Sequence, residues 1–269
     1  MVKIACVQTD VAYGQLEVNL HNCIGHLEEL AAQGVELAIF PECALTGYCV
    51  DSKAEAETIA IEKCCLAPIQ AACNRLNIIC VIGFAEISAS SLYNTAALIE
   101  PFRDPRYYRK SHLPELGYDK YVLPGDSIDV FETRIGRIGI AICFDLRGPE
   151  TCRVLGLKGA DIICLPTNWP HGAQISANTL AAARAVENRV FLAACNRVGC
   201  ENGFDFIGLS GIYGITGNTI AKADEIEEVL IAEVDLESAR NKRITNIPGK
   251  YEMTVFESRR PGLYGSLTE

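Results

Sequence analysis

Short apolar runs separated by polar segments rich in glycine or proline recur along the whole chain. Several of these runs are rich in β-branched residues, which is typical of strands buried on both faces. The clearest predicted strands are 2–8, 35–40, 78–84, 161–165 and 190–196. Weaker patterns predict further strands at 94–99, 106–110, 212–215 and 229–234. The chain therefore contains enough strand to build at least one large sheet.

Between the strands the apolar spacing changes to that of helices. Residues 19–33 carry apolar side chains at helical intervals, and Gly34 follows as a suitable helix end. Residues 54–74 predict a helix interrupted near Pro68, and the alanine-rich stretch 176–187 predicts another. Strands that alternate with helices, without a linker or a low-complexity segment, indicate an α/β fold. We expect one domain that spans residues 1–269.

Two segments of the chain resemble each other. Residues 34–42 align without gaps on residues 159–167, and both read as glycine, strand and proline after a helix. This order is common in α/β proteins, so the likeness has an ordinary explanation. It is equally compatible with two similar halves whose strand ends meet at one cleft.

The stretch 137–150 places a cysteine at the end of a predicted buried strand. Cys143 ends the apolar run, and Pro149 suits the first turn of a helix that we expect to end near Gly159. At such a corner a side chain faces a cleft, and nearby helix N–H groups favour an anion. We therefore expect the thiol to be shifted toward thiolate, as in a nucleophile elbow built with sulfur. The chain has 13 cysteines, so this position alone is weak evidence.

Two further polar residues end apolar strands and complete a chemical set with Cys143. Glu42 follows the strand 35–40 and a proline, and Lys110 ends the strand 106–110. A cysteine nucleophile needs a base that takes its proton and a cation that stabilises the developing oxyanion. Glu42 and Lys110 supply these two groups. A pairing of Cys143 with His112 or His171 is the rival arrangement.

Charge and cysteine content narrow the possible partners and compartment. A net charge of −10 argues against nucleic acid and against an anionic membrane as partners. Residues 1–8 lack the apolar core of a signal peptide, and the odd number of cysteines suits a reducing compartment. We expect a cytoplasmic protein. Neither the cysteines nor the four histidines show zinc-ligand spacing, so no metal site is predicted.

Three segments together resemble a known family. Residues 40–48, 108–114 and 142–150 resemble, in order and spacing, the three signatures of the nitrilase superfamily, the carbon–nitrogen hydrolases. Further stretches that resemble landmarks of this family are 165–170, 183–189 and 259–264. The resemblance covers essentially the whole chain. It implies a four-layer α-β-β-α sandwich that forms a homodimer or higher homo-oligomer, with the tail at about 250–269 in an oligomer interface.

The resemblance also implies roles for individual residues. Glu42 would be the general base, Lys110 the cation on the tetrahedral intermediate and Cys143 the nucleophile. The backbone N–H of Phe144 would be a second oxyanion donor. No metal or organic cofactor is implied.

Many family members have a second carboxylate shortly after the lysine. The aligned position here is Asp119, which is one methylene shorter than the usual glutamate, and Glu115 is the alternative.

The predicted function is hydrolysis of a small linear amide to acid and ammonia through a cysteine thioester. Tyr48, Asn168 and Trp169 follow strand ends and are candidates for the lining of the substrate pocket. Within the family the alternatives are a nitrile or an N-carbamoyl compound as substrate. An ω-amide is less favoured, because His-Leu-Pro at residues 112–114 departs from the His-Leu-Phe pattern that a resemblance to ω-amidases would imply. Two alternatives lie outside these hydrolytic functions: a non-catalytic scaffold with the same fold, and a thiol sensor built on the adjacent cysteines 64 and 65.

Overall fold

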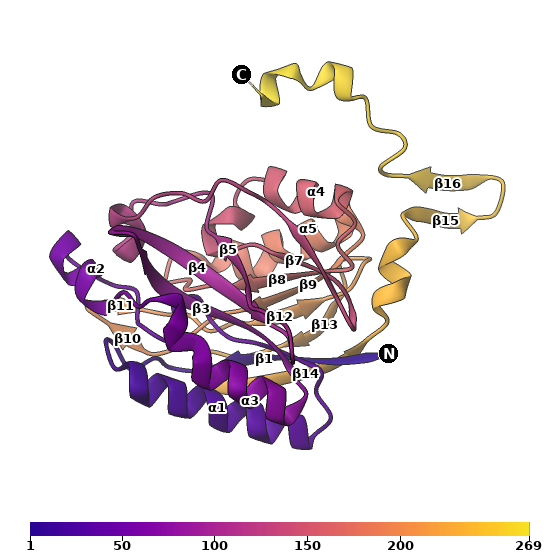
Figure 1. Ribbon diagram of the computed structural model, residues 1–269. Helices are drawn as coiled ribbons and strands as arrows, with labels where there is room; N and C mark the ends of the chain where they lie inside the picture. The colour runs from indigo at the N-terminus through magenta and orange to yellow at the C-terminus, as the bar shows by residue number, and fades with distance from the viewer. Residues whose placement is uncertain (269) are drawn as a thin grey trace.

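Two six-stranded sheets pack face to face, and helices cover the outer side of each (Figure 1). The computed structural model describes residues 1–268. The first sheet has the strand order β14-β1-β2-β3-β4-β5, and the second has the order β13-β12-β9-β8-β7-β6. In Figure 1, α1 and α3 lie below the sheets, whereas α4 and α5 lie above them. The predicted four-layer α-β-β-α sandwich is confirmed.

The elements have the following bounds. The first sheet contains β1 (Val2–Gln8), β2 (Leu37–Ile39), β3 (Ile79–Ser88), β4 (Ser91–Ile99), β5 (Arg106–Arg109) and β14 (Glu228–Val234). The second contains β6 (Val130–Thr133), β7 (Gly136–Ile140), β8 (Ile162–Pro166), β9 (Phe191–Cys195), β12 (Gly211–Tyr213) and β13 (Thr219–Lys222). The α-helices are α1 (Leu16–Ala32), α2 (Lys53–Ile59), α3 (Ala67–Leu76), α4 (Glu150–Leu157) and α5 (Ala181–Asn188). Two small hairpins are formed by β10 (Cys200–Glu201) with β11 (Phe204–Asp205), and by β15 (Arg243–Ile247) with β16 (Tyr251–Thr254).

The centre of each sheet is parallel. Strands β1, β2 and β3 run parallel in the first sheet, and β7, β8 and β9 run parallel in the second. A parallel pair needs a crossover connection, and the covering helices provide these crossovers. Central strands are therefore buried on both faces, which explains their continuous apolar sequences.

Alternate residues of the central strands face different layers. On β1, Ile4 and Cys6 belong to the core between the two sheets, whereas Ala5 and Val7 pack against the helices. The inter-sheet core includes residues of both sheets. The outer core of the second sheet contains residues of α4 and α5. The two sheets are thus held together by a continuous apolar layer.

The two similar segments of the sequence occupy related places in the fold. Gly34 follows α1 and Gly159 follows α4, and both adopt left-handed backbone angles, with φ of 75° and 88°. The strands that follow, β2 and β8, are each the middle strand of a parallel trio, one in each sheet. The likeness therefore reflects two similar halves of the fold.

Several predicted elements need correction. The helix 54–74 is three pieces, because residues 60–62 leave the helix and Ile61 bridges Glu86 of β3. Pro68 lies in the first turn of α3, where a proline is tolerated. The helix 176–187 begins with the π-helical turn η4 (Ser176–Leu180) before α5. The short strands β6, β10, β11 and β13 were not predicted.

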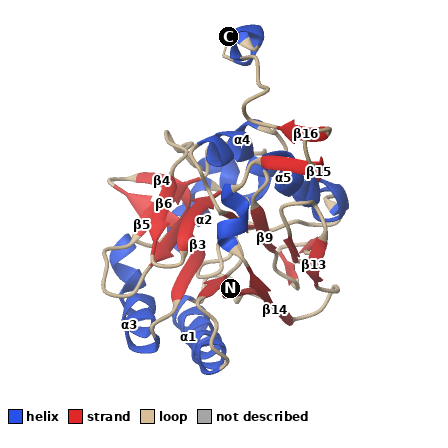
Figure 2. Ribbon diagram, turned by 90° about the vertical axis from the view of Figure 1, so that its right-hand side faces the viewer, coloured by secondary structure: helices blue, strands red, loops and turns tan. Residues whose placement is uncertain are grey.

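The chain after residue 240 projects from the body of the protein (Figure 2). Its first part is regular, because β15 and β16 pair as a hairpin. Two 3-10 turns follow, η6 (Pro261–Leu263) and η7 (Gly265–Leu267). Tyr251 and Leu263 are exposed apolar residues on this tail. Within residues 1–268, no helix combines the length and apolar character needed to span a bilayer.

Gly83 of β3 lies in close contact with the backbone that follows β2. A Cβ on Gly83 would lie 2.5 Å from the backbone nitrogen of Cys43, whereas a Cβ on Gly25 of α1 meets nothing within 4 Å. We expect Gly83→Ala to lower the free energy of unfolding by about 2 kcal/mol through overpacking. Gly25→Ala is the control and is expected to raise it by up to about 1 kcal/mol. Denaturant unfolding measures both, and equal effects would contradict this packing.

Candidate active site

A cluster of buried charges lies at the ends of the strands of the first sheet. Glu42, Lys110 and Asp119 have exposed fractions of 0, 0 and 3%. The Nζ atom of Lys110 lies 2.7 Å from Oε1 of Glu42 and 2.5 Å from Oδ2 of Asp119. One ammonium therefore neutralises one of two carboxylates in a site without solvent, and the cluster keeps a formal charge of −1.

Each member of the cluster is placed by a different element. Glu42 begins the turn after β2, and this turn packs against β3. Lys110 directly follows β5, and its backbone N–H donates to the carbonyl of Asn94 on β4 at 2.8 Å. Asp119 lies in the 3-10 turn η2 (Gly117–Tyr121), where the hydroxyl of Tyr48 donates to its Oδ2 at 2.8 Å.

The structure also distinguishes the two candidates for a second carboxylate. Asp119 contacts Lys110, whereas Glu115 is exposed. The shorter side chain reaches the ammonium because η2 lies directly against the cluster.

Burial and charge act on the two catalytic candidates in opposite senses. Burial raises the pKa of Glu42, the Lys110 ammonium counteracts it, and the charge of Asp119 adds to the rise. Burial lowers the pKa of Lys110, but the carboxylates of Asp119 and Glu42 outweigh burial and raise this pKa well above its usual value. Lys110 thus stays an ammonium at neutral pH, beside a carboxylate that has gained basicity.

Cys143 lies beside this cluster on the other sheet. Strand β7 ends at Ile140, and Cys143 begins the 3-10 turn η3 (Cys143–Leu146) with a φ of 45°, a strained angle for a residue with a side chain. Burial and the charge of Glu42 raise the pKa of the thiol to about 12, whereas Lys110 lowers it. The predicted shift toward thiolate is wrong, because loss of solvent outweighs the nearby donors. The sulfur therefore needs a base.

A buried aspartate connects this turn to the strand that carries Lys110. Asp145 accepts hydrogen bonds from the hydroxyl of Tyr108 at 2.8 Å and from the backbone N–H of Ile142 at 2.9 Å. The Nδ1 atom of His112 lies 2.8 Å from its other oxygen. His112 thus pairs with Asp145, and the rival arrangement that joins it to Cys143 is not formed.

A cavity of about 390 Å³ opens above Cys143. Besides Cys143, four residues that the sequence predicted at the site line it: Tyr48, Phe144, Asn168 and Trp169. Asp119, also a candidate site residue, is not part of this lining, but it accepts a hydrogen bond from the hydroxyl of Tyr48, which is. The side-chain amide of Asn168 is buried and has no hydrogen-bond partner within residues 1–268.

Three polar residues at this site were missed by the sequence analysis. Thr167 follows β8, and its hydroxyl lowers the pKa of the Cys143 thiol. Asn94 contacts both carboxylates of the cluster. Asp145 lay inside the signature 142–150. A polar residue inside an apolar strand was the signal available for Asn94.

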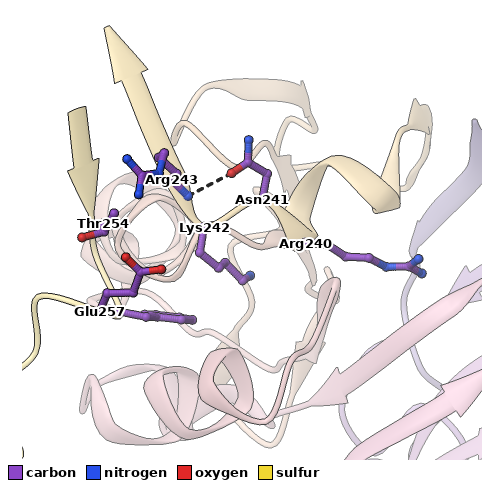
Figure 3. Close-up of a pocket in the computed structure, with 7 residues that line it drawn as sticks. Arg240, Asn241, Lys242, Arg243, Thr254 and Glu257 are labelled. Atoms are coloured by element: carbon purple, nitrogen blue, oxygen red, sulfur yellow. Dashed lines mark hydrogen bonds between the residues drawn. The ribbon is translucent and has the colours of Figure 1, made fainter. Parts of the chain in front are cut away.

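A second cavity, of about 460 Å³, lies at the base of the tail (Figure 3). Its cations are already paired: Arg240 contacts Asp161, and the Nζ of Lys242 donates to the carbonyl of Arg189 at the end of α5. Figure 3 also shows the hydrogen bond from the backbone of Arg243 to Asn241. None of the described residues that line this cavity is a cysteine or a histidine, so it contains none of the candidate nucleophiles.

Comparisons with known proteins agree with this fold. Four sandwich layers, with a cysteine beside a buried glutamate and lysine, are the arrangement that the resemblance to the nitrilase superfamily led us to expect. The sequence profile of the family described as carbon-nitrogen hydrolase matches residues 3–244, and the chain belongs to this family. It is therefore an enzyme that hydrolyses C–N bonds.

Alignments with individual relatives cover most of the chain. A nitrilase of Pyrococcus abyssi is 34% identical over 272 residues, which cover 98% of this chain and 99% of the relative. An N-carbamoylputrescine amidase of Arabidopsis thaliana is 34% identical over 220 residues, covering 74% and 71%. The crystal structure of a carbon-nitrogen hydrolase from Helicobacter pylori G27 has a TM-score of 0.86 at 24% identity, covering 100% and 98%, and shows the same fold.

The two acidic residues after Lys110 allow a paired test. We expect Asp119→Asn to lower turnover at least about 100-fold, because Lys110 loses one of its two carboxylates. Glu115→Gln, at the exposed position, is expected to stay within about twofold of wild type. Ammonia release from a small amide measures both, with the melting temperature recorded in parallel. A larger loss in the Glu115 variant would contradict the assignment.

The pair of His112 and Asp145 predicts a pH-dependent stability. The hydrogen bond that the His112 ring donates to the carboxylate of Asp145 raises the pKa of His112 above its usual value. A raised pKa in the folded state stabilises the protein at low pH, and this contribution is lost as the pH rises through that raised pKa. We expect His112→Asn to destabilise the protein more near about pH 5.5 than near about pH 9. Denaturant unfolding at both pH values, with the exposed His21→Asn as control, measures the difference, and a loss independent of pH would refute it.

Proposed function

We propose that this enzyme is an amidase that hydrolyses a small linear amide to a carboxylic acid and ammonia. One observation carries the proposal: Cys143 forms part of the lining of a small cavity, directly beside the buried cluster of Glu42, Lys110 and Asp119. This set contains a nucleophile, a base and a cation. It is the combination that acyl transfer from an amide requires.

In the first step Cys143 attacks the carbon of the amide. Its thiol is protonated at neutral pH, so Glu42 takes the proton as the S–C bond forms. The negative charge that develops on the amide oxygen is stabilised by the ammonium of Lys110. The backbone N–H of Phe144 is a second donor, because the first turn of a helical segment provides no acceptor for it.

In the second step the C–N bond breaks. Glu42, now protonated, gives its proton to the departing nitrogen, which leaves as ammonia, and an acyl thioester remains on Cys143. Water then attacks the thioester carbon while Glu42 takes a proton from it. The C–S bond breaks, the thiol recovers its proton, and the acid is released.

The lining of the cavity limits the charge of the substrate. None of the described residues that line the cavity is an aspartate or a glutamate. Arg147 and His171 are both part of the lining. A substrate with a distal ammonium would meet Arg147 without a carboxylate to pair with. A neutral substrate, or one with a distal carboxylate, fits this lining better.

Nitriles and N-carbamoyl compounds are the second candidates. They are favoured by the names of the relatives, a nitrilase and an N-carbamoylputrescine amidase. The same nucleophile attacks either group, so the cluster alone does not separate these substrates from amides.

A panel of small amides, nitriles and carbamoyl compounds tests the proposal. We expect ammonia release from amides, and from neutral or anionic ones faster than from cationic ones. Turnover of carbamoyl compounds alone, with carbon dioxide released, would contradict the amidase assignment, and no turnover by wild type would favour a scaffold. Cys143→Ala is expected to abolish turnover with an unchanged fold. Glu42→Gln and Lys110→Ala are each expected to reduce it at least about 1000-fold.

A further inference from the structure

We propose that Asn94 is a positioning residue that determines which carboxylate oxygen of Glu42 exchanges protons with Cys143. The inference rests on the proposed function, because it assigns Glu42 as the base. It concerns a residue that touches neither the cavity nor the nucleophile, and it follows from the hydrogen bonds around the cluster.

The side-chain amide of Asn94 connects the two carboxylates. Its Nδ2 donates to Oε1 of Glu42 at 2.7 Å and to Oδ1 of Asp119 at 2.8 Å. Both hydrogens of this nitrogen are therefore used. The orientation of the amide is fixed in turn, because the thiol of Cys43 faces its Oδ1 at 3.8 Å.

These contacts make the two oxygens of Glu42 unequal. Oε1 accepts hydrogen bonds from both Asn94 and Lys110, at 2.7 Å each. Oε2 is buried and has no hydrogen-bond partner within residues 1–268. A proton added to Oε1 would displace two strong donors, whereas Oε2 is free to accept one. Oε2 is therefore the oxygen that exchanges the proton.

The sheet holds Asn94 rigidly in this position. It lies on β4, between β3 and β5, and its carbonyl accepts the backbone N–H of Lys110. The next residue, Thr95, faces the opposite side of the sheet and donates to Glu86. One residue thus fixes the backbone of Lys110 through its carbonyl and the carboxylate of Glu42 through its amide.

The neutral charge of the amide is part of the argument. Glu42 is faced by Lys110, Asp119 and the Cys143 thiol, and the cluster also contacts Tyr48 and Cys43. A second cation at position 94 would hold Glu42 as a weaker base. An amide supplies the additional donor without adding charge, so Glu42 is oriented and still accepts a proton.

Alkylation of Cys143 by iodoacetamide, followed by mass spectrometry from about pH 5 to pH 9, tests the proposal without requiring amide turnover. In Asn94→Ala, Glu42 loses a donor that stabilises its ionised form. We expect alkylation to be about tenfold slower than in wild type near pH 6, with a smaller ratio near pH 9. Asn94→Asp places a third carboxylate in the cluster and is expected to be slower still near pH 6.

The matched control is Asn19→Ala. Asn19 is a similarly buried asparagine whose amide donates to the carbonyls of Ala12 and Leu45 and to neither carboxylate of the cluster. Its variant is expected to lose stability while keeping the wild-type pH profile of alkylation. If Asn94→Ala does not fold, Asn94→Ser, which keeps one donor, is tested with an expected intermediate shift.

The possible outcomes separate the two proposals. A pH profile of the folded Asn94 variants that coincides with that of wild type would overturn the positioning role. A shifted profile in an enzyme whose wild type releases no ammonia from amides would support the positioning role and reject the amidase assignment.

Discussion

The buried ammonium of Lys110 is the constraint on which the rest of the site depends. A charge without solvent must be paired, and here one cation is shared by Glu42 and Asp119. Removing any one of the three leaves a buried charge with too few partners. The ends of β2 and β5 and the turn η2 are therefore held together by the same contacts that orient the base. Structural stability and chemical competence at this site come from one interaction.

The protonated state of the Cys143 thiol explains why a basic carboxylate lies beside it. The pKa of Cys143 is raised to about 12, so the free enzyme holds a neutral sulfur beside a carboxylate of increased basicity. A thiolate formed in advance would add a second negative charge beside Glu42 and Asp119. In the proposed mechanism, proton transfer is delayed until the substrate is attacked, which avoids that charge because the electrons of the sulfur then move to an oxygen that Lys110 stabilises.

The sequence predicted those elements of the structure that depend on the residues close to them in the chain. The central strands and α1 follow from apolar runs and helical spacing, and the signatures around Glu42, Lys110 and Cys143 predicted three residues that the fold brings together. The break at residues 60–62 depends on a bridge from Ile61 to a distant strand, and no local signal marks it. The state of the Cys143 thiol depended on burial depth, which the sequence does not show. The contacts of Asn94 join residues 25 and 52 positions away, so only the fold reveals them.

The division of the site between the two sheets links catalysis to core packing. Glu42 and Lys110 follow strands of the first sheet, whereas Cys143 and Thr167 follow strands of the second. The apolar layer between the sheets includes Ile39 beside the Glu42 turn and Ile140 before Cys143. A close-packed layer of this kind has low compressibility and leaves the spacing of the two sheets little freedom to change. Because the proposed proton transfer and attack depend on close positioning, the inter-sheet core contributes to catalysis in this mechanism by holding Glu42 and Cys143 at a constant distance, as the polar contacts do.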